Sequence, residues 1–383
     1  MKVPFFRLKF GPAEKKAVRD VIASGWLTTG PRVREFERRI SQFTGAKYAA
    51  AVSSGTAGLH LSLKGVGIGP GDEVITTPMT MAATVEAILY CGAKPVLADI
   101  DPVSLNIDPG AVEKKITSKT KAVVAVDMAG VPCEYHALKE IAGKYGISLI
   151  EDAAHALGGE YRKKRIGTIA DATVFSFYPT KNITTGEGGI VTTNSGRLAG
   201  KIRRLSLHGM DSSGWQRYKG GSWRYDITDL GFKYNMAELP AALGLAQLDR
   251  FEKFRGKREH LAKRYAKGLS GLTEYLEIPL EYDDRKPARH LYIVRLNRKN
   301  WRIDRDRVIM ELEKRGVGCG VHFIPIYRFK YYKERLDYKP KDFPNTEASF
   351  KRIISLPFYV DLSFKEVDYV CTVLHNIAKK FSR

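Results

Sequence analysis

The chain has 383 residues, of which 44% are hydrophobic and 27% are charged. That composition excludes a disordered chain, and the length predicts two domains, or one large domain with a smaller lobe. The formal net charge is +21, but the lysines and arginines are spread along the chain without a nucleic-acid-binding motif. We therefore expect no nucleic-acid partner.

Features of secretion or membrane insertion are missing from the sequence. The apolar runs are short, strand-like stretches such as Ala122–Val126, and the N-terminal segment lacks the continuous apolar region of a secretory signal. The cysteines show no CxxC spacing; they are Cys91, Cys133, Cys319 and Cys371. We expect a cytoplasmic protein with reduced thiols, no bound metal and no membrane partner.

Two amphipathic helices are predicted within residues 1–40, around the turn Gly25–Pro31. From residue 45 to 195, short apolar runs alternate with segments of helical periodicity, of which Thr84–Cys91 and Tyr135–Tyr145 are the clearest. The runs expected to form buried strands are Glu73–Thr77, Pro95–Ile100, Ala122–Asp127, Ser148–Asp152 and Thr173–Phe177. This alternation predicts an α/β fold with a mostly parallel sheet covered by helices on both faces.

The rest of the chain predicts one more strand of this sheet and then a smaller α+β region. Gly188–Gly189 form a turn into a strand at Ile190–Thr193. The later elements begin with a long helical stretch over Met236–Leu269, which can contain a break. They continue with a strand at His290–Leu296 and helices at Arg305–Arg315 and Phe364–Lys380. We place a boundary near residue 250, between a large domain (1–250, with its N-terminal helical segment) and a small C-terminal domain (251–383).

Three sequence features that could bind a ligand or take part in a reaction lie where elements of the predicted sheet begin or end. Ser53–Ala57 (SSGTA) could hold a phosphate with its amides and hydroxyls, or could simply cap a helix. Asp152 could pair with a protonated ring nitrogen of a cofactor, or cap a helix. Lys181 could attack an aldehyde if its pKa is lowered, although a loop lysine is ordinarily a solvated charge. Their order along one βαβ series is less expected by chance than each alone.

Several longer motifs accompany these features. They are SGWLTTGPRVREFE (24–37), AVSSGTAGLHLSL (51–63), GDEVITTPMT (71–80), IEDAAHALG (150–158), FSFYPTKNITTGEGG (175–189), KYNMAELPAALG (233–244) and ISLPFY (354–359). With these motifs the sequence resembles, over nearly its whole length, the sugar-nucleotide aminotransferases of the DegT/DnrJ family. That family belongs to the fold-type I enzymes that use pyridoxal 5′-phosphate (PLP).

The resemblance implies a role for each matching residue. Lys181 would carry PLP as a Schiff base and act as the acid–base group, and Asp152 would keep the pyridine nitrogen protonated. His155 would lie beside the ring, and Met81 stands where relatives commonly place an aromatic ring on the cofactor. The expected phosphate ligands are Gly55, Thr56 and Ser176. Asn235 would reach the phosphate of the neighbouring subunit, which implies a homodimer with shared active sites.

Substrate contacts are less well defined by the sequence. Tyr178 and Tyr327 stand at or near positions where relatives often have a histidine. The candidates for contacts with the sugar nucleotide are Thr28, Tyr178, His290, His322 and Tyr327. His290, His322 and Tyr327 could equally be structural residues.

The resemblance implies amino transfer from L-glutamate, which leaves 2-oxoglutarate, to a keto group at C4 of a nucleotide-linked sugar. Its nearest form is an enzyme making UDP-linked 4-amino-4-deoxy-L-arabinose or a related amino sugar for lipid A or surface polysaccharide. A 3-keto substrate and a dTDP or GDP carrier stay open. One alternative is a sugar dehydratase that uses pyridoxamine phosphate (PMP), although such relatives commonly replace the lysine by histidine. Another is a regulatory or nucleic-acid-binding protein that reuses the fold.

Overall fold

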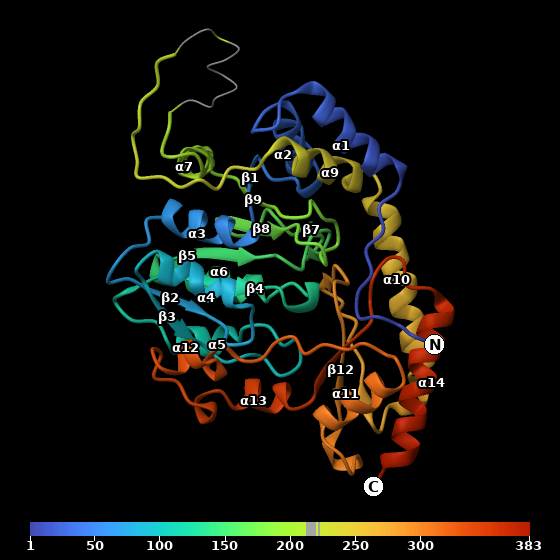
Figure 1. Cartoon of the computed structure of the whole chain (residues 1–383). Helices are drawn as coiled ribbons and strands as arrows, with labels where there is room; N and C mark the ends of the chain where they lie inside the picture. The colour runs from blue at the N-terminus through green and yellow to red at the C-terminus, as the bar shows by residue number, and fades with distance from the viewer. Residues whose placement is uncertain (212–219, 221–222) are drawn as a thin grey trace.

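A seven-stranded sheet forms the centre of the computed structural model, which describes residues 1–211, 220 and 223–383 (Figure 1). The strand order is β1-β9-β8-β5-β4-β2-β3. The strands are β1 (Tyr48–Val52), β2 (Glu73–Thr76), β3 (Lys94–Leu97), β4 (Thr120–Val126), β5 (Ser148–Asp152), β8 (Ala172–Ser176) and β9 (Gly189–Thr193). Only β9 runs antiparallel to its neighbours in this sheet. The prediction of a mostly parallel sheet in an α/β fold is confirmed.

The predicted strands differ from the observed ones mainly at their ends. β3 ends at Leu97, three residues before the predicted end, because the chain leaves the sheet and Ile100 pairs instead with Ile107. The edge strand β1 was not among the predicted strands. The antiparallel direction of β9 was not predicted, and the short connection from β8 explains it, since a parallel neighbour would need a crossover.

Helices cover both faces of the sheet, as predicted. One face packs on α3 (Gly55–Gly65), α4 (Ala82–Tyr90) and α7 (Gly196–Ser206). The other packs on α2 (Pro31–Thr44), α6 (Tyr135–Tyr145) and α9 (Glu238–Leu248), with the short α5 (Pro109–Glu113) at its margin. Alternate residues of β4 divide between the two cores: Ala122 and Val124 face the first, Val123 and Ala125 the second.

The N-terminal helices pack on α9 at one end of the sheet. Both α1 (Pro12–Ser24) and α2 contact α9. A turn at Asp249–Arg250 separates α9 from α10 (Phe251–Gly268). Glu238 caps α2 from across the chain: its carboxylate accepts hydrogen bonds from the amides of Arg32 and Val33, each at 2.9 Å. This contact supplies the acceptor that Gly30, at the start of α2, lacks.

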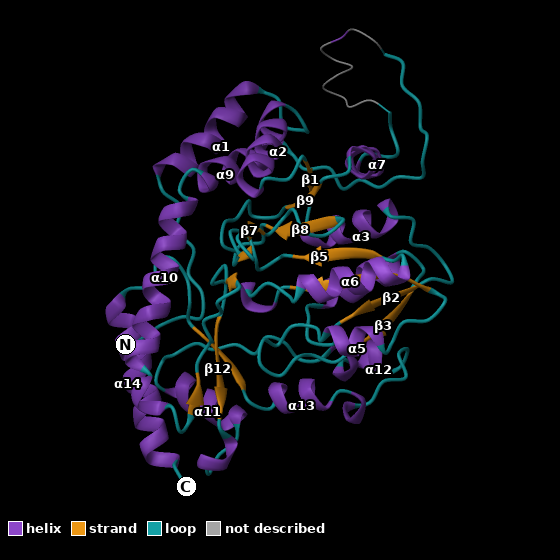
Figure 2. Ribbon diagram, turned by 180° about the vertical axis from the view of Figure 1, so that it is seen from behind, coloured by secondary structure: helices purple, strands orange, loops and turns teal. Residues whose placement is uncertain are grey.

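The C-terminal region has its own small sheet and core. Strand β12 (Tyr292–Leu296) pairs antiparallel with β10 (Leu276–Glu277) and β13 (Ile353–Leu356), beside α11 (Arg305–Lys314) and α14 (Phe364–Phe381) (Figure 2). The first residues of the chain join this region, because Val3 is fully buried in its core and pairs with Val317. The boundary near residue 250 stays a prediction.

Shorter elements complete the described chain. They are β6 (Glu160–Tyr161), β7 (Lys164–Arg165), β11 (Arg285–Lys286), α12 (Lys330–Lys333), α13 (Pro344–Phe350) and the 3₁₀ turns Met128–Gly130, Ser270–Leu272, Arg298–Asn300, Ile326–Arg328 and Pro340–Asp342. In the part of the chain that is described, we find no helix with the length and apolar character needed to cross a membrane.

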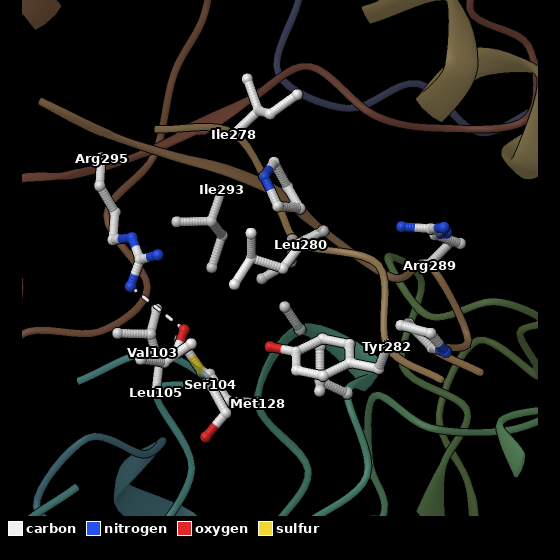
Figure 3. A pocket seen from close by; sticks show the side chains of 15 residues that line it. Val103, Ser104, Leu105, Met128, Ile278, Leu280, Tyr282, Arg289, Ile293 and Arg295 are labelled. Atoms are coloured by element: carbon white, nitrogen blue, oxygen red, sulfur yellow. Dashed lines mark hydrogen bonds between the residues drawn. The ribbon is translucent and has the colours of Figure 1, made fainter. Parts of the chain in front are cut away.

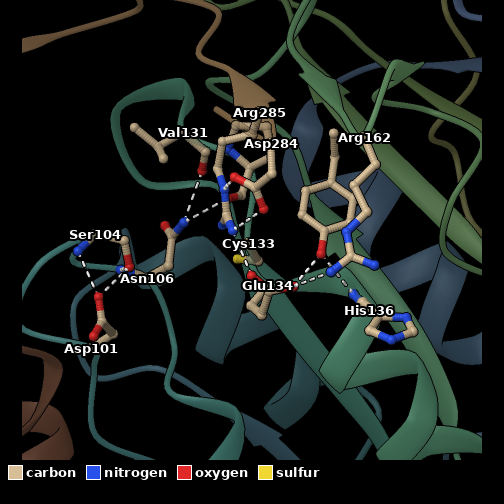
Figure 4. Close-up of polar contacts among 12 residues, drawn as sticks. Asp101, Ser104, Asn106, Val131, Cys133, Glu134, His136, Arg162, Asp284 and Arg285 are labelled. Atoms are coloured by element: carbon tan, nitrogen blue, oxygen red, sulfur yellow. Dashed lines mark hydrogen bonds and ion pairs between the residues drawn. The ribbon is translucent and has the colours of Figure 1, made fainter. Parts of the chain in front are cut away.

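Arg285 fastens the segment before β12 to the large sheet region (Figure 4). Its guanidinium pairs with Glu134 at 2.5 Å and with Asp284 at 2.7 Å, and it donates to the carbonyl oxygen of Pro132 at 2.9 Å. Asn106 donates to that same carbonyl and to the one before it. This polar cluster holds residues 284–286 against the start of α6.

A pair of buried acids lies next to β4 and β5. The carboxylate of Asp127 accepts hydrogen bonds from the Tyr135 hydroxyl (2.7 Å) and the Cys133 amide (2.8 Å), and Glu151 accepts one from the Thr173 hydroxyl (2.5 Å). Asp127 and Glu151 are fully buried and influence each other's pKa, and each has one carboxylate oxygen without a hydrogen-bond partner. Burial raises the pKa of both carboxyls. A single shared proton would satisfy both free oxygens.

We predict that Asp127→Asn is at least as stable as the wild type at pH 9, because an amide can donate to Glu151 without taking up a proton. In the unfolded protein the pKa of such a carboxyl is about 4, and in the folded protein it is higher. Below about pH 4 the wild-type pair therefore makes its full contribution to the free energy of unfolding. This contribution is lost as the pH rises through the pKa of the folded protein. Asp127→Ala should lose about 1–3 kcal/mol by leaving donors unpaired. Urea unfolding at pH 5 and pH 9 measures both. Equal destabilisation by Asn and Ala at pH 9 would contradict the shared proton.

Candidate active site

A cavity of about 420 Å³ opens at the carboxyl ends of the central parallel strands. Val126, Asp152 and Ser176, which end β4, β5 and β8, lie on its wall, where ligands bind in sheets of this type. The predicted site residues that line it are Gly55, Thr56, Met81, Asp152, His155, Ser176, Tyr178, Lys181, His290 and His322. The structure thus brings together predicted residues from six separate stretches of the sequence.

One end of the cavity is suited to a phosphate. Helix α3 begins at Gly55, and the Ser54 hydroxyl caps it by accepting from the Ala57 amide at 3.0 Å. The first amides of a helix have no acceptor within it, and here Gly55 and Thr56 line the cavity. A Cβ at Gly55 would stand only 3.1 Å from the Cβ of Ser176. Glycine therefore lets the helix start and the Ser176 hydroxyl approach the same space.

Asp152 is buried and held by two donors. The Thr84 hydroxyl donates to its Oδ2 at 2.8 Å, and the Ala154 amide donates to its Oδ1 at 3.2 Å. Burial raises the pKa of Asp152, while the Thr84 hydrogen bond and the charge of Lys181 act in the opposite direction. No α-helix follows Asp152 within the described residues 153–159, so the helix-capping interpretation does not apply.

Lys181 lies in the loop after β8, with its amine inside the cavity. Removal of this amine from water lowers its pKa to about 8, with Asp152 opposing the shift. About a tenth of the amine is then unprotonated at pH 7, compared with less than a thousandth for an ordinary lysine. The Lys181 amine can thus act as a nucleophile, unlike the protonated, solvated amine of an ordinary loop lysine.

Imidazole rings form another wall. His155 stacks on His290 with their ring centroids 4.3 Å apart, and on Phe323 at 5.8 Å. His322 stacks on Phe5 at 5.6 Å and shares a hydrogen bond of 2.8 Å with the Ser355 hydroxyl. Burial and the nearby Lys181 lower the pKa of all three histidines, that of His322 to about 4. These rings are therefore neutral at physiological pH.

Three predicted residues do not line this cavity. The Tyr327 hydroxyl donates to Glu347 at 2.8 Å and its ring stacks on Phe343, so it forms part of a hydrophobic cluster. Thr28 is exposed at the turn between α1 and α2. Asn235 lies in a separate hollow of about 530 Å³, where it donates to the Thr29 hydroxyl at 2.7 Å. Its predicted reach into a neighbouring subunit stays a prediction.

Some residues of the cavity were missed. Thr80 and Glu187 line the cavity and lie within two of the motifs that carry the resemblance, but neither was predicted as a site residue. Thr84 lies outside the lining, donates to Asp152 and shares a hydrogen bond with Thr80, four residues before it. Phe5 and Phe6 had no signal in the sequence, because they reach the cavity only through pairing of the N-terminal segment with residues 316–318.

A second, smaller cavity of about 50 Å³ lies between the 3₁₀ turn at 128–130 and strand β12 (Figure 3). Its lining is largely apolar, and none of the predicted site residues is part of it. Arg295 points to the carbonyl oxygens of Pro102 and Val103, and Arg289 pairs with Glu281. The volume is too small for a cofactor.

The donor set of the large cavity fits PLP. Helix amides and a serine hydroxyl suit its phosphate, the buried carboxylate of Asp152 suits a protonated ring nitrogen, and the Lys181 amine suits its aldehyde. The glycine at position 55 leaves open the space that the phosphate needs.

Comparisons with known proteins agree with this geometry. A spore coat polysaccharide biosynthesis protein, SpsC of Bacillus subtilis, is 44% identical over 379 residues, which cover 98% of this chain and 97% of SpsC. The PLP form of the putative sugar aminotransferase Spr1654 of Streptococcus pneumoniae superimposes with a TM-score of 0.93 at 34% identity, over 99% of each chain. PseC of Helicobacter pylori, an aminotransferase involved in the biosynthesis of pseudoaminic acid, gives a TM-score of 0.91 at 32% identity, with full coverage of both chains. The sequence profile of the DegT/DnrJ/EryC1/StrS aminotransferase family matches residues 9–375, and the chain belongs to that family.

Proposed function

We propose that this protein moves an amino group from L-glutamate to a keto group at C4 of a nucleotide-linked sugar. The protein is a PLP-dependent sugar aminotransferase, and the proposal adds the amino donor, the carbon position and the nucleotide-linked form of the sugar. The observation that supports the proposal best is the meeting of Lys181, Asp152 and the amides of α3 in one cavity. We place the product in the formation of surface polysaccharide or lipid A, and the name of SpsC, a spore coat polysaccharide biosynthesis protein, supports the former.

Each residue of the cavity has a part that its contacts support. When bound, PLP supplies an electron-accepting ring for the carbon that gains or loses the amino group. The Thr84 hydroxyl and the Ala154 amide favour the ionised form of Asp152, and an ionised Asp152 would hold a proton on the ring nitrogen of bound PLP. The Lys181 Nζ can take up and release a proton near neutral pH. Both half-reactions, with glutamate and with the keto sugar, would use this same amine.

The remaining part of the cavity would receive the sugar. Met81 and Tyr178 are 61% and 49% exposed at its mouth, so a large substrate can approach there. We propose Tyr178, His290 and His322 as its contacts. Tyr327 is not among them, because Glu347 and Phe343 account for its hydroxyl and its ring.

A dehydratase is not favoured, because Lys181 is retained and its amine lines the cavity with a lowered pKa. A regulatory protein would not need an amine and a carboxylate kept in one buried site. The L-arabinose derivative stays one candidate product among several.

Product analysis tests the proposal directly. The PLP-loaded protein is incubated with L-glutamate and a panel of UDP-, dTDP- and GDP-linked 4-keto and 3-keto sugars, and products are identified by mass spectrometry. We expect a 4-amino sugar and an equal amount of 2-oxoglutarate. Lys181→Ala should form neither, because it lacks the amine that both half-reactions need. If no nucleotide sugar is aminated, the proposal is wrong.

Asp152→Asn should retain PLP yet react with glutamate more slowly, by a factor on the order of a hundred. An amide fits the space between Thr84 and Ala154 but cannot stabilise a positive charge on the ring nitrogen. Single-turnover absorbance changes with glutamate measure this step. Thr84→Val is the matched control: it keeps the carboxylate and removes one hydrogen bond, so its effect should be smaller. An unchanged rate for Asp152→Asn would leave that residue a purely structural role.

We further propose a homodimer in which Asn235 completes the partner's phosphate site. Mixing Lys181→Ala subunits with Asn235→Ala subunits tests it, since some hybrid dimers would then have one intact site and one doubly altered site. We expect the mixture to be more active than either variant alone, as measured by the glutamate–keto sugar assay. If both residues serve the same subunit's site, every site retains one defect and no excess activity will be seen.

A further inference from the structure

Asn182, the residue after Lys181, connects three segments of the cavity wall. Its Nδ2 donates to the carbonyl oxygen of Ala288 at 2.8 Å and to that of Leu157 at 3.5 Å. Its Oδ1 lies 3.1 Å from the Nδ1 of His290. Asn182 is buried, so these contacts are made out of water.

The two carbonyl oxygens decide which way the amide faces. A carbonyl oxygen only accepts hydrogen bonds, so Nδ2 must point toward Ala288 and Leu157. With the amide turned over, its oxygen would oppose both carbonyls, and its NH₂ group would face His290. The observed orientation therefore leaves an acceptor, Oδ1, in front of the His290 ring.

The orientation of Asn182 in turn fixes the hydrogen on His290. Facing an acceptor, Nδ1 of His290 must donate, so it carries the hydrogen. Burial, the stacked His155 ring and the charges of Lys181 and Arg258 lower the pKa of His290, which keeps the ring neutral. A neutral imidazole has one hydrogen, so Nε2 is left as an unprotonated acceptor.

His322 in the same cavity shows the contrast. Its Nδ1 faces the Ser355 hydroxyl, which can either donate or accept. The contact therefore allows both tautomers of His322, whereas Asn182 allows only one for His290.

We propose that Asn182 is a positioning residue, which fixes His290 as the Nδ1–H tautomer so that its Nε2 accepts a hydrogen bond from a hydroxyl of the bound sugar. His290 lines the cavity, and Nε2 is the ring nitrogen that Asn182 leaves available. A bare nitrogen lone pair attracts a hydroxyl and repels carboxylate and phosphate oxygens. It thus favours the sugar over the anionic groups of either substrate. The identity of the donor rests on the proposed function; the tautomer does not.

The tautomer can be read without any turnover. In PLP-loaded protein with ¹⁵N-labelled histidine, long-range ¹H–¹⁵N NMR correlations distinguish the two neutral forms and the cation for each of the eight histidines. His290→Gln identifies the signals of His290. We expect the Nδ1–H form at pH 7 in the wild type, lost or mixed in Asn182→Leu, and kept in Ser355→Ala, which alters only the neighbour of His322. An Nε2–H or cationic His290 in the wild type would overturn the proposal, and this spectrum decides even if Asn182→Leu fails to fold.

The acceptor role is tested on a UDP-linked 4-keto-6-deoxyhexose. His290→Phe keeps a ring against His155 but has no acceptor, so KM for the sugar should rise about three- to tenfold, more than KM for glutamate. His290→Gln, with an amide oxygen, should recover most of the loss. His136→Phe, at an exposed position, is the control and should change neither. Equal changes in both KM values, or none, would overturn the acceptor role. If no nucleotide sugar is aminated, the proposed function fails, and the NMR result still decides the tautomer.

Discussion

Removal of the Lys181 amine from water is the constraint on which the rest of the site depends. Burial of a cation is costly unless an opposite charge lies near or the proton is lost, and here both occur in part: Asp152 is close, and the pKa falls to about 8. The loop must hold the amine in place against this cost. Hydrogen bonds from Phe177 to Gly188 and from Thr185 to Phe177, at 2.9 and 3.0 Å, close the loop on itself, and Asn182 fastens it to the segments opposite.

The parallel sheet sets the distance between the parts of the site. β5 and β8 are neighbours with Asp152 opposite Val174, so the acid and Ser176 end at the same edge. The antiparallel strand β9 then brings Gly189 against the start of α3, where a Cβ would stand 2.5 Å from the Ser54 carbonyl carbon. A side chain at position 189 would displace the helix whose amides face the cavity. Strand order, strand direction and the missing side chain at Gly189 together fix the end of the cavity at the start of α3.

Much of the fold and of the site could be predicted from the sequence, and the parts that could not be predicted have physical reasons. Continuous apolar runs indicate strands that are buried on both faces, as in β4, and helical periodicity indicates helices with one buried face, as in α6. Motifs place Lys181, Asp152 and the SSGTA loop at strand ends, and the sheet then brings them together. Contacts between distant segments leave no such pattern. Phe5 beside His322, Thr84 under Asp152 and Glu347 against Tyr327 follow from how separate elements pack, and no local sequence rule contains that information.

The pairing of Val3 with Val317 also has a consequence for the order in which the protein is made. Val3 and Phe5 leave the ribosome more than three hundred residues before their partners Val317 and His322. Until then Phe5 has no His322 to stack on, and the wall that it forms is missing. The sheet around Asp152 and Lys181 can assemble before that point, so a nascent chain would hold its central chemical groups in a cavity still open on one side. Closure of this side is thus a late event of synthesis, although the segment that closes it is made long before its partners.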